Sequence, residues 1–289
     1  MQLARTDIRP VHPVLGAEVV GLDLARELPE DEFQAIRDAF NRHSLLIFRD
    51  QQALTPAQQV ALSRRFGPLE VHVMRQFLHP DFPEILLVSN EVRDGKNIGL
   101  ADAGRYWHSD LSYKAEPSLG SLLCSKVLPA EGGDTLFAST IAAYERLPAA
   151  LRARLDRLRA EHDYGARSKQ RAATGARPEL SAAQRAEVPP VVHPVVRVHP
   201  ETGKRALFVS EGFTTRILDI PEDESGSILQ QLFAAEVDPE IIYRHKWRPG
   251  DMVMWDNRAL IHLAAGCPPE MARTMFRTTI KGDVPVGVS

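Results

Sequence analysis

The chain has 289 residues, of which 44% are hydrophobic and 25% charged, with a formal net charge of -3. This is the composition of a globular protein that is long enough to bury a large core. The near-neutral charge excludes the broad basic surface of a nucleic-acid-binding protein and a polybasic membrane anchor, so we expect neither nucleic acid nor a membrane as a partner.

The N-terminal stretch MQLARTDIRP lacks the apolar core of a signal peptide. The longest apolar runs in the rest of the chain are far too short to cross a bilayer. Cys124 and Cys267 are the only cysteines, which are too few for a disulfide framework and are typical of a reducing compartment. We therefore expect a cytoplasmic protein.

The first quarter of the chain alternates extended and helical patterns. Residues 11–24 read as two short extended pieces joined by a glycine turn, and residues 29–43 have the apolar spacing of a helix with acids in its first turn. Residues 44–50 form a short apolar run that predicts a buried strand. Residues 55–67 predict a second helix, with Thr55 as its N-cap.

Most of the remaining chain consists of strand-length stretches rich in apolar or β-branched residues. These are residues 84–90, 118–128, 133–139, 193–200, 204–210, 240–247, 251–257 and 273–280. Two predicted helices interrupt them, at residues 141–159 (with a break at Pro148) and 221–237. Many short strands with few helices predict a mainly β fold with flanking helices (α+β), built on a sandwich or barrel-like core.

Residues 164–190 differ from their surroundings because they are polar, rich in alanine and arginine, and without a clean apolar face. They predict a long surface excursion with one short helix. Long loops in compact domains are commonly lids or binding loops, but a passive insertion is an equal alternative. We expect a single domain over residues 1–289 that carries this lid or insertion.

The stretch YWHSDLS places His108 and Asp110 two positions apart. On a strand, such residues point to the same side, so an imidazole and a carboxylate could meet on one Fe(II), Mn(II) or Zn(II) ion. The alternative is a polar pair at a strand edge that bonds to backbone or water.

A third ligand has to come from elsewhere in the chain. His12, His79, His193 and His199 each precede a proline, while His43 and His162 lie at the ends of predicted helices, so we interpret all six as structural or exposed. His262 differs because it follows the apolar strand DMVMW within a buried β region, where an unpaired imidazole would be costly. A buried core histidine is the alternative for this residue alone.

Arg273 and Arg277 lie in the strand-like run RTMFRTTI. Residues four apart on a strand share a face, so both guanidinium groups should point into the apolar interior, and no nearby acid is evident to pair with them. A planar guanidinium suits a carboxylate or sulfonate. Two histidines, one carboxylate and arginines for small anions are the composition of a non-haem Fe(II) site with open positions.

These motifs, taken in order, make the chain resemble the family of Fe(II)- and 2-oxoglutarate-dependent oxygenases that contains taurine dioxygenase and 2,4-dichlorophenoxyacetate dioxygenase. The motifs are WHSD, GGDT at 132–135, WDNRALIH at 255–262 and RTMFR at 273–277. Residues 193–217 are similar to the taurine dioxygenase branch. The resemblance covers nearly the whole chain and implies a double-stranded β-helix (jelly-roll, cupin-like) core and a homo-oligomer, either a dimer or a tetramer.

The resemblance also implies roles for residues. His108, Asp110 and His262 would hold Fe(II), and Arg273 would bind the distal carboxylate of 2-oxoglutarate with help from the Thr135 hydroxyl. Arg277 would also contribute to cofactor binding, lie close to the metal and attract the anionic group of the substrate. The reaction would use O2 to hydroxylate a C–H bond and would release succinate and CO2.

Several positions bear on the substrate, which we expect to be a small organic anion such as taurine or a related alkanesulfonate. His72 and Phe213 match substrate-contacting residues of taurine enzymes, but Arg75 stands where those enzymes carry a tyrosine and Gly104 where they carry an asparagine. Arg75 or Arg105 could then be a second basic contact or a solvent-facing charge. An alkyl sulfate or an aryloxy-carboxylate is the alternative substrate, and a non-catalytic 2-oxoglutarate-binding sensor is the alternative class of protein.

Overall fold

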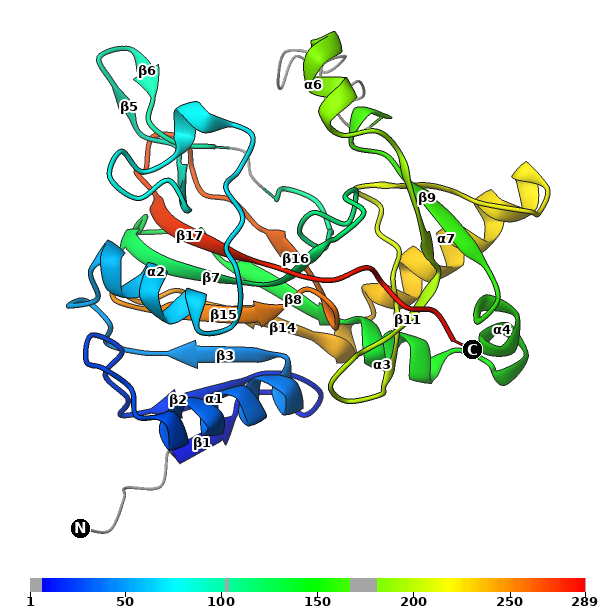
Figure 1. The fold of residues 1–289 in the computed structure, drawn as a ribbon, viewed down its shortest axis with the longest axis horizontal. Coiled ribbons are helices and arrows are strands. Elements are labelled where there is room, and N and C mark those ends of the chain that lie inside the picture. Colours follow the sequence, from blue (N-terminus) through cyan, green and yellow to red (C-terminus); the bar gives the residue numbers. More distant parts are fainter. Residues whose placement is uncertain (1–6, 102–103, 167–180, 289) are drawn as a thin grey trace.

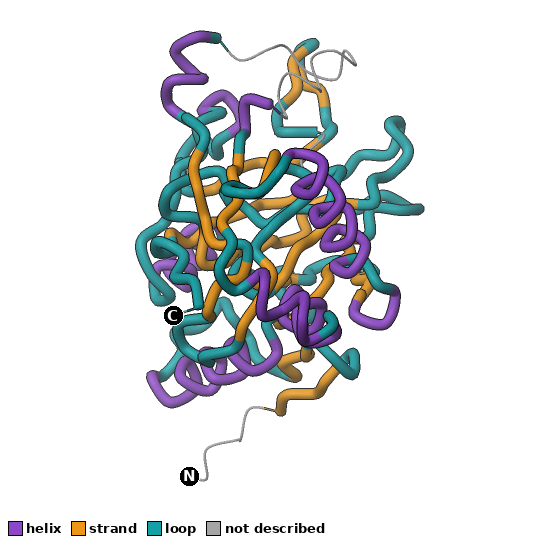
Figure 2. Tube along the Cα trace, turned by 90° about the vertical axis from the view of Figure 1, so that its right-hand side faces the viewer, coloured by secondary structure: helices purple, strands orange, loops and turns teal. Residues whose placement is uncertain are grey.

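The computed structural model of the chain describes residues 7–101, 104–166 and 181–288 (Figure 1). The strands lie at the centre of the molecule and the helices lie around them (Figure 2). The expected fold class, a jelly-roll core with flanking helices, is confirmed. Among the described residues, no helix is both long and apolar enough to cross a membrane.

The larger of the two core sheets has seven strands. In spatial order they are β1 (Asp7–Pro10), β2 (Ala17–Val20), β3 (Leu45–Phe48), β15 (Met252–Asp256), β7 (Ser118–Val127), β17 (Thr274–Lys281) and β4 (Ile85–Ser89). Strands β15, β7 and β17 form the antiparallel centre of this sheet. Strands from the beginning and the end of the chain therefore lie side by side.

The smaller core sheet has three antiparallel strands, in the order β14 (Ile242–His245), β8 (Thr135–Ser139) and β16 (Leu260–Ala264). Its side chains meet the inner face of the larger sheet in one apolar cluster. Phe137 and Leu260 of the smaller sheet pack there with Ile47, Val253 and Trp255 of the larger one.

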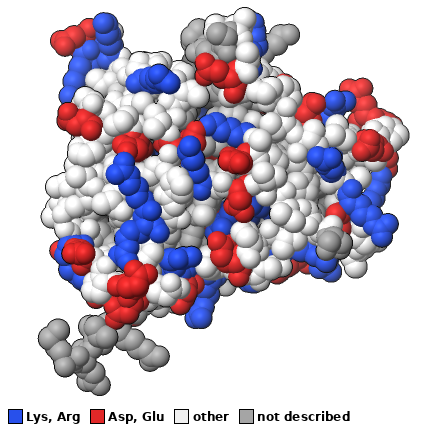
Figure 3. Space-filling model, in the orientation of Figure 1, with Lys and Arg blue, Asp and Glu red and all other residues white. Residues whose placement is uncertain are grey.

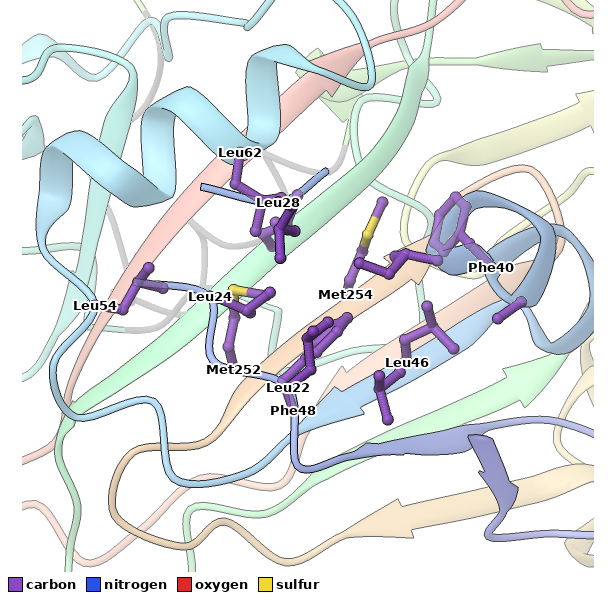
Figure 4. Close-up of a cluster of buried hydrophobic side chains, with 14 of the residues drawn as sticks. Leu22, Leu24, Leu28, Phe40, Leu46, Phe48, Leu54, Leu62, Met252 and Met254 are labelled. Carbon is purple, nitrogen blue, oxygen red and sulfur yellow. The ribbon is translucent and has the colours of Figure 1, made fainter. Parts of the chain in front are cut away.

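The outer face of the larger sheet is covered by α1 (Glu30–His43) and α2 (Pro56–Arg64). Side chains alternate along β3, so Leu46 and Phe48 face this side while Leu45 and Ile47 face the inner cluster. Figure 4 shows the outer cluster, in which Leu46 and Phe48 lie with Met252 and Met254 of β15. This explains the continuous apolar run in β3: a strand that is buried on both faces has no polar positions.

The second predicted helix begins as expected. The Thr55 side chain accepts a hydrogen bond from the backbone of Gln58, and the Gln58 side chain bonds back to the Thr55 backbone, which completes a capping box. The predicted helix at 141–159 is two helices, α3 (Thr140–Arg146) and α4 (Ala149–Leu155), separated at Pro148.

A third apolar cluster lies beside the two core sheets (Figure 1, right). It joins α3, α4 and α7 (Glu222–Glu236) to two small sheets. The strands of these sheets are β9 (Arg159–His162), β10 (Val191–Pro194) and β13 (Thr214–Ile217), and β11 (Val196–Val198) with β12 (Arg205–Leu207). The prediction that His162 ends a helix is wrong, because the residue lies on β9 and is fully buried.

The remaining elements are short. They are the hairpin β5 (Val92–Arg93) and β6 (Lys96–Asn97), the 3-10 turns η1 (Arg75–Phe77) and η2 (Pro239–Ile241), and α6 (Ala182–Glu187). Helix α6 is the short helix expected within 164–190, but residues 167–180 of the predicted lid lie outside the described residues. Lys and Arg side chains alternate with Asp and Glu over the face that Figure 3 shows.

Candidate metal centre and adjoining cavities

The candidate metal centre begins with a backbone contact between two segments that are distant in sequence. His108 and His262 form an isolated antiparallel bridge, in which the His108 backbone N–H donates to the His262 carbonyl at 3.1 Å and the reverse bond is 2.8 Å. The two imidazole rings lie 4.2 Å apart between centroids. The bridge holds both residues beside the middle of β16 (Leu260–Ala264).

Asp110 reaches the same point by a route that we did not predict. The expected strand through His108 and Asp110 is wrong, since only His108 makes a bridge and the chain then turns, with Leu111 at a φ of 59°. Nevertheless, the Asp110 carboxylate lies 3.7 Å from His108 Nε2 and 4.0 Å from His262 Nε2. The ligand atoms of all three residues lie within 4.8 Å of one another.

The chemistry of this cluster suits a divalent metal. His108 Nδ1 lies 2.8 Å from the Tyr106 carbonyl, so it carries the hydrogen and leaves the Nε2 lone pair toward Asp110. His262 Nδ1 is buried without a hydrogen-bond partner among the described residues. Three buried donors of the two-histidine, one-carboxylate type are the set used by non-haem Fe(II) sites.

The electrostatics keep the cluster in its ligating form. Burial, reinforced by His108, holds the pKa of His262 well below the usual histidine range, so its imidazole is neutral. Burial alone would raise the pKa of Asp110, but Arg277 and the two imidazoles outweigh it and hold this pKa well below the usual range. A neutral imidazole and an ionised carboxylate are the states that bind a metal.

Two residues that sequence reasoning missed hold Asp110 in place. Ser121 on β7 donates a hydrogen bond from its hydroxyl to Asp110 Oδ2 at 2.8 Å. The Asn257 side-chain oxygen accepts the Asp110 backbone N–H at 3.2 Å, while its amide nitrogen donates to Ser118 at 2.7 Å. Asn257 stands in WDNRALIH, so the motif itself was visible, but the partner of its side chain was not.

A buried ionic network supports the turn before His262. Asp256 accepts hydrogen bonds from the Arg258 guanidinium at 2.8 and 2.7 Å, and one of its oxygens lies 3.0 Å from His199 Nε2. Burial opposes ionisation of Asp256, but Arg258 and His199 outweigh it and lower its pKa. His199, expected to be structural or exposed, is structural.

Arg277 has an acidic partner, which corrects our sequence interpretation. It lies on the inner face of β17, opposite Leu123 of β7, and its Nη1 donates to Asp110 Oδ1 at 3.0 Å. The partner escaped notice because Asp110 was assigned to the metal and lies far away in sequence. Arg277 Nε is buried and has no hydrogen-bond partner among the described residues, so it needs an acceptor.

Arg273 lies four residues earlier in a separate cavity of about 320 Å³. Its backbone N–H donates to the Asn90 side chain at 2.8 Å, and its Nε is also buried without a partner in the described part of the chain. Burial lowers the pKa of Arg273 to about 10, which still leaves it charged at neutral pH. Arg105 lines the same cavity, as does Cys267.

The GGDT motif lies beside Arg273. A Cβ on Gly133 would lie 3.3 Å from Arg273 Nε and 3.0 Å from Pro129, and the φ of +78° also favours glycine there. Thr135 is buried at the start of β8, opposite Ala264, which lines the Arg273 cavity. The Thr135 oxygen accepts the Trp247 indole N–H at 3.0 Å, so its own hydrogen can be donated to another group.

A second, smaller cavity of about 50 Å³ lies over the metal cluster. His108, Asp110 and Arg277 line this cavity, and its other lining residues are mostly aromatic or apolar. These wall residues are His72, Leu100, Gly104, Tyr106, Leu111, Tyr113, Tyr164 and Phe213. His72 and Phe213 were predicted to contact substrate, whereas the three tyrosines were missed; two of them flank the WHSD motif in sequence.

Gly104 and Arg75 are the two departures from the taurine pattern. A Cβ on Gly104 would come within 2.9 Å of His108 Cε1, so the absence of a side chain there lets the imidazole approach the loop. Arg75 is exposed on η1 and is not among the residues that line this cavity. Its role as a substrate contact stays a prediction.

Comparisons with known proteins agree with this geometry. The family described as "Taurine catabolism dioxygenase TauD, TfdA family" matches residues 7–279. The 2,4-dichlorophenoxyacetate dioxygenase of Cupriavidus pinatubonensis is 35% identical, over 96% of this chain and 98% of the relative. The (S)-phenoxypropionate/alpha-ketoglutarate-dioxygenase of Sphingobium herbicidovorans is 36% identical, over 96% of this chain and 95% of the relative. The crystal structure of AAD-2 in complex with Mn(II) and N-oxalylglycine superimposes with a TM-score of 0.83 at 30% identity, over 96% of this chain and 99% of AAD-2.

Proposed function

Because the chain belongs to the TauD, TfdA family of 2-oxoglutarate-dependent dioxygenases, we propose that it hydroxylates an aryloxyalkanoate at the carbon next to the ether oxygen. The oxidation itself comes from Fe(II), 2-oxoglutarate and O2, which these enzymes require. Hydroxylation at that carbon gives a hemiacetal, which breaks into a phenol and an oxo-acid, while 2-oxoglutarate becomes succinate and CO2.

The residues of the metal cluster would hold the iron. His108, Asp110 and His262 would supply three ligands and leave the other positions of the metal to 2-oxoglutarate and O2. Arg273, with its unpartnered Nε and its own cavity, would bind the distal carboxylate of 2-oxoglutarate. The Thr135 hydroxyl, which can donate its hydrogen, would assist.

One observation carries the choice of substrate: the cavity over the metal cluster combines a single cation with aromatic walls. Arg277 would receive the carboxylate through its unpartnered Nε. Tyr106, Tyr113 and Phe213 form ring contacts around the same space, which suits a flat aromatic group. A short alkanesulfonate such as taurine would leave such walls uncontacted, so we place sulfonates and alkyl sulfates second.

The test is succinate release by the Fe(II)-loaded protein with 2-oxoglutarate and one anion at a time. We expect phenoxyacetate to stimulate release more strongly than taurine, hexanesulfonate or hexyl sulfate at equal concentration, with phenol formed in equal amount to succinate. Stronger stimulation by a sulfonate or a sulfate ester, without phenol from phenoxyacetate, would contradict the proposal.

A further inference from the structure

The small cavity over the metal cluster has a neighbour on the other side of one residue. Tyr113 lines the small cavity of about 50 Å³ and also a second cavity of about 470 Å³. No other residue of the described chain lines both of them. Tyr113 therefore forms the shared wall of the two cavities.

The wall is held by aromatic contacts. The Tyr113 ring lies 4.5 Å from the Tyr164 ring and 4.9 Å from the Phe213 ring, measured between centroids. Val188, which lines the larger cavity, belongs to the same apolar cluster. Only 5% of Tyr113 is exposed, so the residue is packed into the interior rather than lying along the surface.

The sizes of the two spaces make this wall important for substrate. Ligand cavities commonly measure about 300–1,000 Å³, so the small one leaves no space for a substrate group that extends beyond the aryl ring while the Tyr113 wall is closed. The larger one has an apolar side formed by Val188, Pro189 and Val191. Charged residues also line it, among them Lys114 and Glu70, which pair with each other.

We propose that Tyr113 determines the length of substrate that the enzyme accepts, and that the larger cavity takes the apolar end of the substrate when this ring is displaced or shortened. The inference rests on the proposed function, because it concerns the substrate of the same site. It assigns the larger cavity as a subsite for an apolar tail and Tyr113 as its boundary.

The experiment compares two substrates that differ only in length, phenoxyacetate and 4-hexylphenoxyacetate. The quantity measured is the ratio of kcat/KM for the long substrate to that for the short one, from succinate release. In Tyr113→Ala we expect this ratio to rise by at least about tenfold, since even one methylene in an apolar pocket changes kcat/KM by about 10–200-fold. Tyr113→Phe keeps the ring and should keep the wild-type ratio.

Leu100→Ala is the matched control. Leu100 lines the small cavity but not the larger one, so its truncation enlarges the small cavity without joining the two. We expect its ratio to stay within about threefold of wild type, because no new subsite opens for the apolar tail. An equal rise in Leu100→Ala and Tyr113→Ala, or no rise in Tyr113→Ala, would overturn the proposal.

Two further measurements distinguish the role of Tyr113 from a folding defect and from a failure of the proposed function. If Tyr113→Ala unfolds, Tyr113→Leu is measured instead, with the same expected direction. If wild-type protein releases no phenol from phenoxyacetate, the proposed function fails, and the length comparison is then made in the anion class that wild type does oxidise, between a butyl and a decyl member. The ratio in that series supports or overturns the role of Tyr113 independently.

Discussion

Arg273 and Arg277 lie four residues apart on one chain segment, yet their surroundings differ. Arg273 faces a cavity of about 320 Å³ and has no acidic partner among the described residues, whereas Arg277 faces a cavity of about 50 Å³ and is bonded to Asp110. Both have a buried Nε that lacks an acceptor in the described parts of the chain. Arg273 is therefore available to pair with an added anion, whereas the charge of Arg277 is already partly neutralised by Asp110.

The difference has an energetic consequence for the two anions that we assign to these sites. An anion that reaches Arg273 compensates a buried charge that is otherwise unpaired, so its binding should be strongly favourable. An anion that reaches Arg277 shares the guanidinium with Asp110, which reduces the gain. The 2-oxoglutarate site should therefore be less tolerant of mutation than the substrate site.

Replacing Arg273 should have the largest effect on anion binding. We expect Arg273→Ala to weaken apparent 2-oxoglutarate affinity by roughly 100–1,000-fold, because a buried bidentate ion pair is worth about 3–4 kcal/mol when one partner is removed. Metal affinity should change little, since Arg273 contacts none of the three ligand side chains. The measurement is 2-oxoglutarate dependence of succinate release, with Mn(II) binding assayed separately.

Arg105→Ala is the control for that variant. Arg105 lines the same cavity but is exposed, so its removal should weaken 2-oxoglutarate affinity only a few-fold. A loss of 2-oxoglutarate affinity as large as that in Arg273→Ala would show that Arg273 is not the main anion-binding residue of this cavity.

Replacing Arg277 should have a smaller effect on anion binding, mainly on the substrate, and it also removes the hydrogen bond to Asp110. We expect Arg277→Ala to raise KM for the organic anion about 10–100-fold, the loss of one charge-assisted hydrogen bond of about 1.5–3 kcal/mol. Apparent 2-oxoglutarate affinity should stay within about threefold of wild type. Arg277→Lys retains the charge but not the planar fork, so its KM for the organic anion should lie between those of wild type and Arg277→Ala. An equal loss of affinity for 2-oxoglutarate and for the organic anion would contradict the assignment of the two anions to separate cavities.

Glu236 provides a control for this comparison, because its buried carboxyl lines neither of the two cavities. Glu236 in the last turn of α7 is 1% exposed, its Oε1 lacks a partner within the described residues, and burial raises its pKa well above the usual range. The neutral form is therefore favoured in the folded state, so Glu236 costs stability as pH rises above about 4.3, where the unfolded chain ionises.

We accordingly expect Glu236→Gln to raise the free energy of unfolding at pH 7.5 by about 1 kcal/mol, and this gain to shrink as pH falls toward about 4.3. Neither KM should change. The measurement is urea denaturation across this pH range. The exposed Glu222→Gln in the same helix should give no such gain, and a gain that grows toward low pH would contradict the assignment.

Local patterns predicted the elements that depend on neighbours in sequence. The capping box at Thr55 and the break at Pro148 follow from residue type alone. His108, Asp110 and His262, which the structure brings together, were predicted from the order of several motifs, since the spacing of His108 and Asp110 alone left a polar strand-edge pair as the alternative. His162 was misplaced because its charged neighbours resemble a helix end, whereas pairing with β10 and β13 makes this segment a strand.

What the sequence could not show was contact between distant segments. The ion pair between Arg277 and Asp110 joins residues from two separate motifs, and the aromatic walls of the small cavity come from separate segments around residues 106, 164 and 213. Side chains such as Tyr164 carry no pattern of their own, since a tyrosine near a loop is ordinary until its neighbours in space are known.

The backbone bridge between His108 and His262 has a consequence for how the protein is made. Its two halves are synthesised far apart in time, and β16 pairs with β8 only after most of the chain has left the ribosome. Long-range pairing of this kind forms slowly because a large loop must close first. We therefore expect iron to be loaded only after β16 has been synthesised and paired, since a translation product that ends before His262 lacks one of the three proposed ligands.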